Sequence, residues 1–347
     1  MKRLKSITQP DMTVYEETKR RWNDIAKPLG SFGVLEEIWQ RIAAIQGTPT
    51  PDISERTAVV MCGDHGVVEE GVTQCGSEVT AECAAAIAAG RSNINAIAKQ
   101  CNMNVIAVDM GMITDCPGIL NRKTAHSTRN ITKGEAMTVM QAEYAITAGI
   151  DVVRDLSEKG VKLIVSGEMG IGNTTPASAI ASVLLGIDAE KVTGRGAGLD
   201  SEGLNRKIAA VRKAVSVSSP PPGNAFEVLR CLGGFEIAGM TGLFLGGAVY
   251  RIPVIVDGVI SAAAAAIACG IAPLSAEYMI ASHCSGEPAS EGLLKRCGLK
   301  PVINAGLRLG EGTGAALMVP LLDCTAALYN NAHRFNETSI ERYKELK

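Results

Sequence analysis

Glu311 is a single carboxylate between two glycines, in the stretch LGEGTGAALMVP that begins at Leu309. A strongly apolar, helix-compatible run follows it at once. One interpretation is that this glutamate lies in the first turn of a helix, where the positive end of the helix dipole stabilises a negative charge. The other is that its carboxylate is a general base that takes a proton from a bound substrate. The position of Glu311 alone does not decide between the two.

The stretch SGEMGIGNTTPASAI, residues 166–180, is the most informative in the sequence. Gly170 and Gly172 allow close approach of the backbone, Thr174 and Thr175 offer hydroxyls and a cap, and the next residue, Pro176, suits the first position of a helix. Free backbone N–H groups beside a helix N-terminus can hold an anion, although a simple capped turn would give the same pattern. The Gly-Lys-Ser/Thr of a Walker loop and the third glycine of the dinucleotide fingerprint are missing. A phosphate monoester is therefore the better ligand hypothesis.

Other groups could serve the same anion. Residues 192–200, VTGRGAGLD, form a second glycine-rich turn, and Lys207 follows one to two helical turns after Asp200. A lysine on a helix is usually solvated, so Lys207 by itself is a weak candidate. The stretch SHCSGEP adds Ser285.

Metal and redox chemistry have little support in the sequence. His65 lies in the turn GDHG, but the four histidines show no partner at metal-ligand spacing, so a structural or supporting role is favoured. The ten cysteines include no CxxC pair and indicate small core residues in a reducing cytosol. We expect a cytoplasmic protein without metal or cofactor. No Ser-His-Asp order or nucleophile elbow is present.

The composition excludes several classes of partner. Of the 347 residues 46% are hydrophobic and 20% charged, and the net charge of -2 gives no electrostatic signal for nucleic acid. The start of the chain has no apolar segment of signal-peptide length. The uncharged run at 258–276 is long enough to span a membrane, but it is mostly Ala and Gly and contains Pro273. It predicts a buried helix, and a small molecule is the expected partner.

Short apolar runs alternate with longer helical patterns, which is typical of a parallel sheet with crossover helices. The clearest expected strands are residues 56–63, 104–111, 161–168 and 252–258. Each ends in a polar turn with glycine, and ligands of open α/β sheets bind beyond the carboxyl ends of the strands. The predicted fold is α/β, a doubly wound, mainly parallel, Rossmann-like sheet whose turns surround one crevice.

Helical periodicity marks the segments between and beyond these strands. The expected helices are residues 14–25, 32–46 with Ser31 as N-cap, 79–99, 135–159, 201–215 and 312–330. The two helices before the first strand and the one after the last turn predict a small helical domain made of residues 1–50 and 312–347. Residues 51–311 would form the α/β nucleotide-binding and catalytic domain. SSPPPG at 218–223 is a surface connection, too short to separate domains.

Eight ordered motifs resemble one family, the nicotinate-nucleotide:dimethylbenzimidazole phosphoribosyltransferases, which make the lower-ligand nucleotide of cobamides. The motifs are KPLGSFGVLE, CGDHGV, GEMGIGNTTPA, GRGAGL, GGFEIAGMTG, PVIVDG, SHCSGEP and LRLGEGTGAA. The resemblance covers nearly the whole chain.

The resemblance implies a role for particular residues. Glu311 corresponds to the general base of the LGEG motif, and Glu168 and Lys207 to its supporting charged residues. The residues that match the nucleotide and phosphate contacts are Gly170, Gly172, Asn173, Thr174, Gly196, Lys207 and Ser285. Met169 and Leu309 match the lining of the aromatic pocket.

The implied reaction moves the 5-phosphoribosyl group of nicotinate mononucleotide to a cobamide lower-ligand base. The pyridinium ring departs without protonation, whereas an azole N–H or phenol O–H must lose its proton as the acceptor attacks C1′. A glutamate in a mostly apolar pocket has a raised proton affinity and can take that proton. Attack opposite the leaving group gives an α-linked ribotide from a β-linked substrate. Positioning of the phosphate and stabilisation of the ribose supply the rest without a metal.

The sequence departs from the family pattern in one segment, residues 71–83. Where relatives usually carry Ser-Pro or Tyr-Pro before a Val-Thr pair, and a Gln after it, this chain has Cys75, Gly76 and Cys83. Small, weakly polar side chains thus replace hydrogen-bonding ones at the predicted acceptor pocket. Phenol or p-cresol is therefore an alternative to dimethylbenzimidazole as acceptor.

Two other functions remain open from the sequence. One is a catalytically silent, phosphate-binding paralogue that only completes a dimer, against which the presence of Glu311, Glu168 and Lys207 argues. The other is a nucleotide-dependent oxidoreductase, which needs a complete GxGxxG after a strand. The expected assembly is a homodimer, or a heterodimer with a paralogous chain.

Overall fold

The computed structural model describes residues 2–344 and contains one six-stranded, all-parallel sheet with the order β3-β2-β1-β4-β5-β6. The strands are β1 (Arg56–Gly63), β2 (Asn104–Gly111), β3 (Leu120–Asn121), β4 (Leu163–Met169), β5 (Val254–Val256) and β6 (Met279–Ala281). Strands β2 and β3 lie on one side of β1, and β4, β5 and β6 lie on the other. The topological switch point is therefore between β1 and β4. The predicted doubly wound α/β fold is confirmed.

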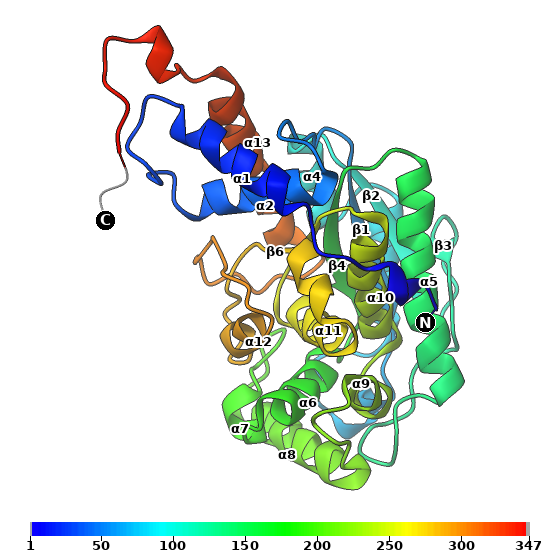
Figure 1. Cartoon of the computed structure of the whole chain (residues 1–347). Coiled ribbons are helices and arrows are strands. Elements are labelled where there is room, and N and C mark those ends of the chain that lie inside the picture. Colours follow the sequence, from blue (N-terminus) through cyan, green and yellow to red (C-terminus); the bar gives the residue numbers. More distant parts are fainter. Residues whose placement is uncertain (1, 345–347) are drawn as a thin grey trace.

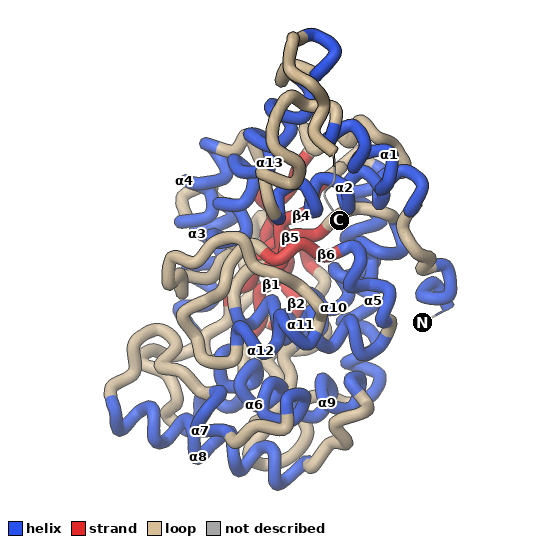
Figure 2. Tube along the Cα trace, turned by 60° about the vertical axis from the view of Figure 1, so that its left-hand side comes forward, coloured by secondary structure: helices blue, strands red, loops and turns tan. Residues whose placement is uncertain are grey.

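Helices cover both faces of the sheet, whose strands lie at the centre of the molecule (Figure 2). Along β1, Val59 and Met61 join one hydrophobic cluster, while Val60 and Cys62 join the other, because successive side chains of a strand point to opposite faces. The first cluster is shared with α5 (Val139–Glu158), α6 (Thr174–Leu185), α8 (Ser201–Ser218), α9 (Ala225–Leu232), α10 (Phe235–Tyr250), α11 (Val259–Ile271) and α12 (Ser290–Arg296). The second is shared with α1 (Met12–Asn23), α2 (Val34–Gln46), α3 (Glu78–Ala88), α4 (Asn93–Gln100) and α13 (Thr313–Asn331).

The remaining helical elements are short. They are α7 (Ala189–Val192) and the 3₁₀ helices Lys2–Ser6, Gly66–Glu70, Pro273–Tyr278 and Phe335–Glu337. The expected strands at 56–63 and 104–111 agree with β1 and β2 to the residue, whereas β3 and β6 have only two and three residues and were not expected.

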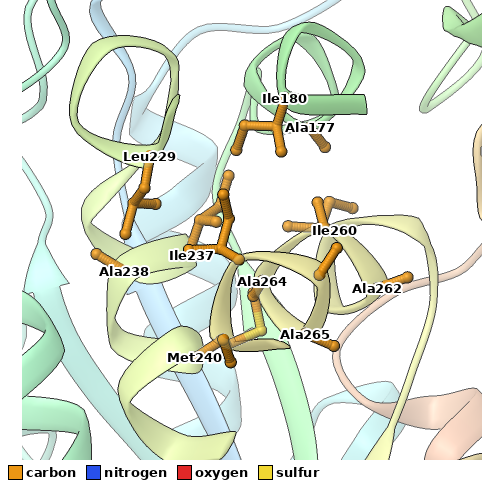
Figure 3. Packing of buried hydrophobic residues seen from close by; sticks show 14 of the residues in the cluster. Ala177, Ile180, Leu229, Ile237, Ala238, Met240, Ile260, Ala262, Ala264 and Ala265 are labelled. Carbon is orange, nitrogen blue, oxygen red and sulfur yellow. The ribbon is translucent and has the colours of Figure 1, made fainter. Parts of the chain in front are cut away.

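Helix α11 is the buried helix predicted from the uncharged run. Ala264 lies on the side of α11 next to Met240 and Ile237 of α10, and Ala262 and Ala265 are small buried side chains on the other sides of the helix (Figure 3). Small side chains bring helix axes together without leaving space unfilled. Within residues 2–344 no helix is both long enough and apolar enough to cross a membrane.

Several predicted helix bounds are wrong. The expected helix 79–99 is two helices, because Gly90 has φ +73° and Ser92 starts α4 as its N-cap. Helix α2 begins after Gly33 and not after Ser31. Helix α6 begins at Thr174, so Pro176 is its third residue and not its first.

The N- and C-terminal helices pack together at one end of the molecule (Figure 1). The ring centroids of Trp22 and Tyr329 lie 4.9 Å apart, and those of Trp39 and Tyr329 lie 6.1 Å apart. The same hydrophobic cluster continues onto the sheet through Val60 and Leu163. The division into a small helical domain and an α/β domain stays a prediction.

Candidate active site

A cavity of about 190 Å³ lies at the carboxyl edge of the sheet. Its lining comes from the end of β4 and the first turn of α6, from the segments after β5 and β6, and from the loop before α13. Residues 72–75, 195–197 and Leu199 complete it, together with Lys207 of α8. The cavity therefore lies where ligands of doubly wound sheets bind.

Most of the residues predicted to react or to bind line this cavity. They are Cys75, Glu168, Met169, Gly170, Gly172, Asn173, Thr174, Gly196, Lys207, Ser285, Leu309 and Glu311. Gly76 and Cys83 lie outside the lining. Burial raises the pKa of the Cys83 thiol, and the charge of Glu311 contributes to this shift, so Cys83 lies near that carboxylate.

The backbone of Glu311 lies directly on strand β4. Gly310, Glu311 and Gly312 all have positive φ, at +86°, +60° and +85°. A Cβ at Gly167 of β4 would lie 2.5 Å from the Glu311 carbonyl oxygen, so only glycine allows this approach. A non-glycine residue with positive φ is costly, and such strain clusters at functional sites.

The Glu311 side chain is buried and bonded to a helix other than the one that follows it. Its Oε1 accepts a hydrogen bond from Asn93 Nδ2 at 2.7 Å, and its Oε2 accepts one from the Ile94 N–H at 3.1 Å. Asn93 and Ile94 are the first two residues of α4. Glu311 is thus not in the first turn of α13, and the helix dipole that stabilises its charge is that of α4.

Glu168 is a second carboxyl group at the cavity. Its pKa is raised to about 8, first by burial and then by the charge of Asp257, while the hydrogen bond from the Asn173 amide to Oε2 opposes the shift. At neutral pH this carboxyl group is mostly protonated. The group with the clearly raised proton affinity is therefore Glu168.

We expect Glu168→Gln to stabilise the protein increasingly as the pH rises. The carboxyl pKa goes from 4.5 in the unfolded chain to about 8 in the folded one, so between these values the unfolded chain holds fewer protons and stability falls with pH. Glutamine does not titrate. The Tm difference between variant and wild type should grow by at least about 2 °C from pH 5 to pH 8.5. Glu341→Gln, on the exposed C-terminal segment, is the control. If the Tm difference between Glu168→Gln and wild type did not change with pH, the raised pKa of Glu168 would be refuted.

Lys207 is only 1% exposed. Its Nζ donates to Thr174 Oγ1 at 2.7 Å and to the Gly194 carbonyl oxygen at 3.0 Å, and both acceptors are uncharged. Burial lowers the pKa of Lys207 to about 8, and the charge of Glu287 offsets part of this. A buried ammonium group bonded to neutral oxygens favours an anion as its further partner.

Gly196 lies against the same ammonium group. A Cβ at this position would be 3.0 Å from Thr174 Oγ1 and 3.3 Å from Lys207 Nζ, and its φ is +54°. Its N–H donates to Glu287 Oε1 at 3.1 Å. A backbone N–H that holds a carboxylate oxygen is a donor suited to anions, so the structure brings three of the predicted phosphate contacts together.

Sequence reasoning missed several titratable residues of the cavity, among them Asp257 and His283. Asp257 follows β5 directly, and its Oδ1 accepts from the Ala315 N–H of α13 at 2.8 Å. Burial raises the pKa of Asp257 and lowers that of His283. The charge of each residue opposes the shift of the other. Both lie just after strands, in motifs already noted for their glycine or serine content, and that position was the signal.

His65 has the supporting position expected of it. It is buried outside the cavity lining and shares a hydrogen bond of 2.8 Å between its Nε2 and Glu236 Oε1. Among residues 2–344 no group of three or more His, Cys, Asp or Glu side chains has an arrangement that could hold a metal ion.

A doubly wound parallel sheet with a charged cavity at its carboxyl edge is typical of α/β enzymes that bind nucleotides. A family model described as phosphoribosyltransferase matches residues 7–340. A nicotinate-nucleotide–dimethylbenzimidazole phosphoribosyltransferase of Ruminiclostridium cellulolyticum is 42% identical over 99% of this chain and 98% of its own. One of Acetivibrio thermocellus is 42% identical over 98% of each chain. The chain belongs to this phosphoribosyltransferase family, and the resemblance of the eight motifs is confirmed.

Solved structures agree with this assignment. The crystal structure of CobT from Thermus thermophilus matches with a TM-score of 0.89 and 37% identity, over 95% of this chain and 100% of that one. A nicotinate-nucleotide–dimethylbenzimidazole phosphoribosyltransferase structure from the same organism gives a TM-score of 0.88 at 36% identity, over 96% and 100% of the two chains.

Proposed function

We propose that this enzyme transfers the 5-phosphoribosyl group of nicotinate mononucleotide to an aromatic acceptor, giving nicotinate and an α-linked ribotide. The observation that carries the proposal is the charge arrangement of the cavity. A buried ammonium group, Lys207, lies with Thr174 and Gly196, and the carboxyl groups of Glu168 and Glu311 line the same cavity. Nicotinate mononucleotide carries a phosphate that complements the ammonium group and a pyridinium cation that complements the Glu311 carboxylate, while Glu168, mostly protonated at neutral pH, adds a polar group to the cavity.

The phosphate has a natural place beside Lys207. Its oxygens would accept hydrogen bonds from the ammonium group and from the Gly196 N–H, replacing the Glu287 oxygen that this N–H now contacts. The negative phosphate would also raise the pKa of Lys207 from its lowered value of about 8. Binding at this end orients C1′ of the ribose toward the carboxyl groups.

In the reaction the bond between C1′ and the pyridinium nitrogen breaks, and its electron pair neutralises the ring nitrogen. The acceptor supplies the pair for the new bond to C1′ from the opposite face. A benzimidazole attacks through its unprotonated nitrogen and loses the proton of the other nitrogen, whereas a phenol attacks through the oxygen that loses the proton. In both cases we assign Glu311 as the base. Glu168, with its raised pKa, supports the site beside the departing ring.

The direct test is turnover. The purified chain would be incubated with nicotinate mononucleotide and a panel of benzimidazoles, purines and phenols, and the products identified by mass. A new ribotide and free nicotinate support the proposal. If the protein binds the nucleotide but forms no product with any acceptor, the result favours the silent paralogue. Hydride transfer would favour an oxidoreductase.

The acceptor pocket favours a further expectation, that phenol and p-cresol are used better here than by a typical benzimidazole-using relative. Cys75, Met169 and Leu309 all line the cavity, so its wall offers apolar surface and a weakly polar thiol. When the second heteroatom of an acceptor is buried without a hydrogen-bond partner, the acceptor loses about 1–3 kcal/mol of binding free energy, or about 10- to 100-fold in affinity. A competition at equal concentrations of p-cresol and dimethylbenzimidazole would measure this. Absence of any O-linked product, even with p-cresol alone, would refute it.

We also propose a cytoplasmic dimer, either of two copies or with a paralogous chain. All ten cysteines are free thiols, as expected in a reducing compartment. Met140 and Tyr144, one turn apart on α5, are 81% and 51% exposed and offer apolar surface to a partner. Light scattering of the purified chain would give its mass in solution.

A further inference from the structure

The break between α3 and α4 creates a helix N-terminus next to the proposed base. Ser92 is the N-cap of α4, and the two residues after it, Asn93 and Ile94, donate hydrogen bonds to the two carboxylate oxygens of Glu311. One donor is a side-chain amide and the other a backbone N–H. Two donors on different atoms fix both the position and the plane of a carboxylate group.

The backbone of the same residue is held from the opposite side. The Glu311 carbonyl oxygen packs on Gly167, and a Cβ at Gly312 would lie 2.9 Å from the Ser166 carbonyl oxygen. Strand β4 thus fixes the main chain of Glu311, and α4 fixes its side chain. A glutamate side chain otherwise has considerable rotamer freedom, which is lost when it is held at both ends.

We propose that Asn93 is the positioning residue of the catalytic base, an inference that rests on the proposed role of Glu311. The Asn93 amide occupies one lone pair of Oε1 and leaves another free, so the carboxylate can accept a proton while it is held. Asn93 itself is exposed and is not part of the cavity lining. It acts on the reaction through the placement of Glu311.

The first turn of helix α4 also has hydrogen bonds that do not involve Glu311. They make it possible to distinguish the positioning of Glu311 from the stability of the helix. The Asn95 side chain accepts a hydrogen bond from the Ser92 N–H at 3.1 Å and one from the Ser92 hydroxyl at 2.7 Å. Asn95 is thus bonded to the N-cap of the same helix, whereas the hydrogen bonds to Glu311 come from Asn93 and Ile94. Its substitution is therefore the matched control for that of Asn93.

The experiment compares Asn93→Ala, Asn93→Asp, Asn93→Gln and Asn95→Ala in the full-length protein, with dimethylbenzimidazole as acceptor. We expect kcat to fall about 10- to 100-fold in the first two, because a charge-assisted hydrogen bond to a reacting group is lost, while KM for nicotinate mononucleotide changes less than about twofold. Asn93→Gln retains the amide donor and should recover part of kcat. Asn95→Ala should keep kcat within about threefold, with any loss of Tm measured separately.

A double variant makes the test specific. If Asn93 acts only through Glu311, Glu311→Gln with Asn93→Ala should be no slower than Glu311→Gln alone. Wild-type kcat in Asn93→Ala, additive losses in the double variant, or an equal loss in Asn95→Ala would each overturn the positioning role while the base assignment stands. Wild-type turnover in Glu311→Gln would overturn the base assignment and the positioning role together.

Discussion

Glu311→Gln should lower the transfer rate by about 10²- to 10⁴-fold, the usual contribution of a general base. The amide keeps the size of the side chain and can still accept a bond from Asn93 or Ile94, so the loop on β4 should stay folded. It cannot take a proton from the acceptor. The rate is measured as release of nicotinate at saturating acceptor.

Nucleotide binding should remain near wild type in this variant, because the residues that we propose to hold the phosphate are others of the cavity lining. Equilibrium binding of nicotinate mononucleotide would verify this, and Glu341→Gln on the exposed C-terminal segment serves as a control for charge loss. Full turnover of Glu311→Gln with a weakly acidic acceptor would show that another group is the base. Glu168 would then be the next candidate, because its pKa is raised to about 8.

Lys207→Met should raise KM for nicotinate mononucleotide by about 10- to 100-fold, since the variant loses a charge-assisted hydrogen bond to the phosphate. The apolar side chain fits the buried position of the lysine stem. With nicotinate riboside, which has no phosphate, the variant should differ little from wild type. The comparison of the two substrates is therefore the measurement.

The matched control is Lys213→Met, an exposed lysine on the same helix α8. Its KM should be unchanged. Equal losses of Lys207→Met with the nucleotide and with the riboside would indicate a structural role for the lysine and count against a phosphate site. Affinity of the wild-type protein for inorganic phosphate should also fall as the pH rises above 8, because Lys207 then loses its charge.

Sequence patterns predicted the parts of the fold that rest on long, continuous signals. Strands β1 and β2 are eight-residue apolar runs that end in glycine turns, and their bounds were found to the residue. Strands β3 and β6, of two and three residues, are too short for any periodicity to show. Tertiary pairing with β2 and β5 makes them strands.

The site was predictable where its residues follow strands, since the carboxyl ends of parallel strands meet at one edge. The GEMG turn, which follows β4, lines the cavity, whereas Lys207 of α8, which also lines it, was a weak candidate by itself and became a site residue only through the family resemblance. Asn93 was missed because the segment 79–99 looked like one helix, in which Asn93 would be an interior residue. The signals for the break were Gly90, as a helix terminator, and Ser92 with Asn95 three residues later, which together are typical of a new N-terminus.

The packing of the terminal helices has an optical consequence. The chain has two tryptophans, Trp22 and Trp39, and both are buried against the ring of Tyr329 at the seam between the N-terminal helices and α13. Neither lines the cavity. The intrinsic tryptophan fluorescence of the protein should thus report whether α13 is packed against the N-terminal helices. It should not depend on whether the cavity holds a substrate.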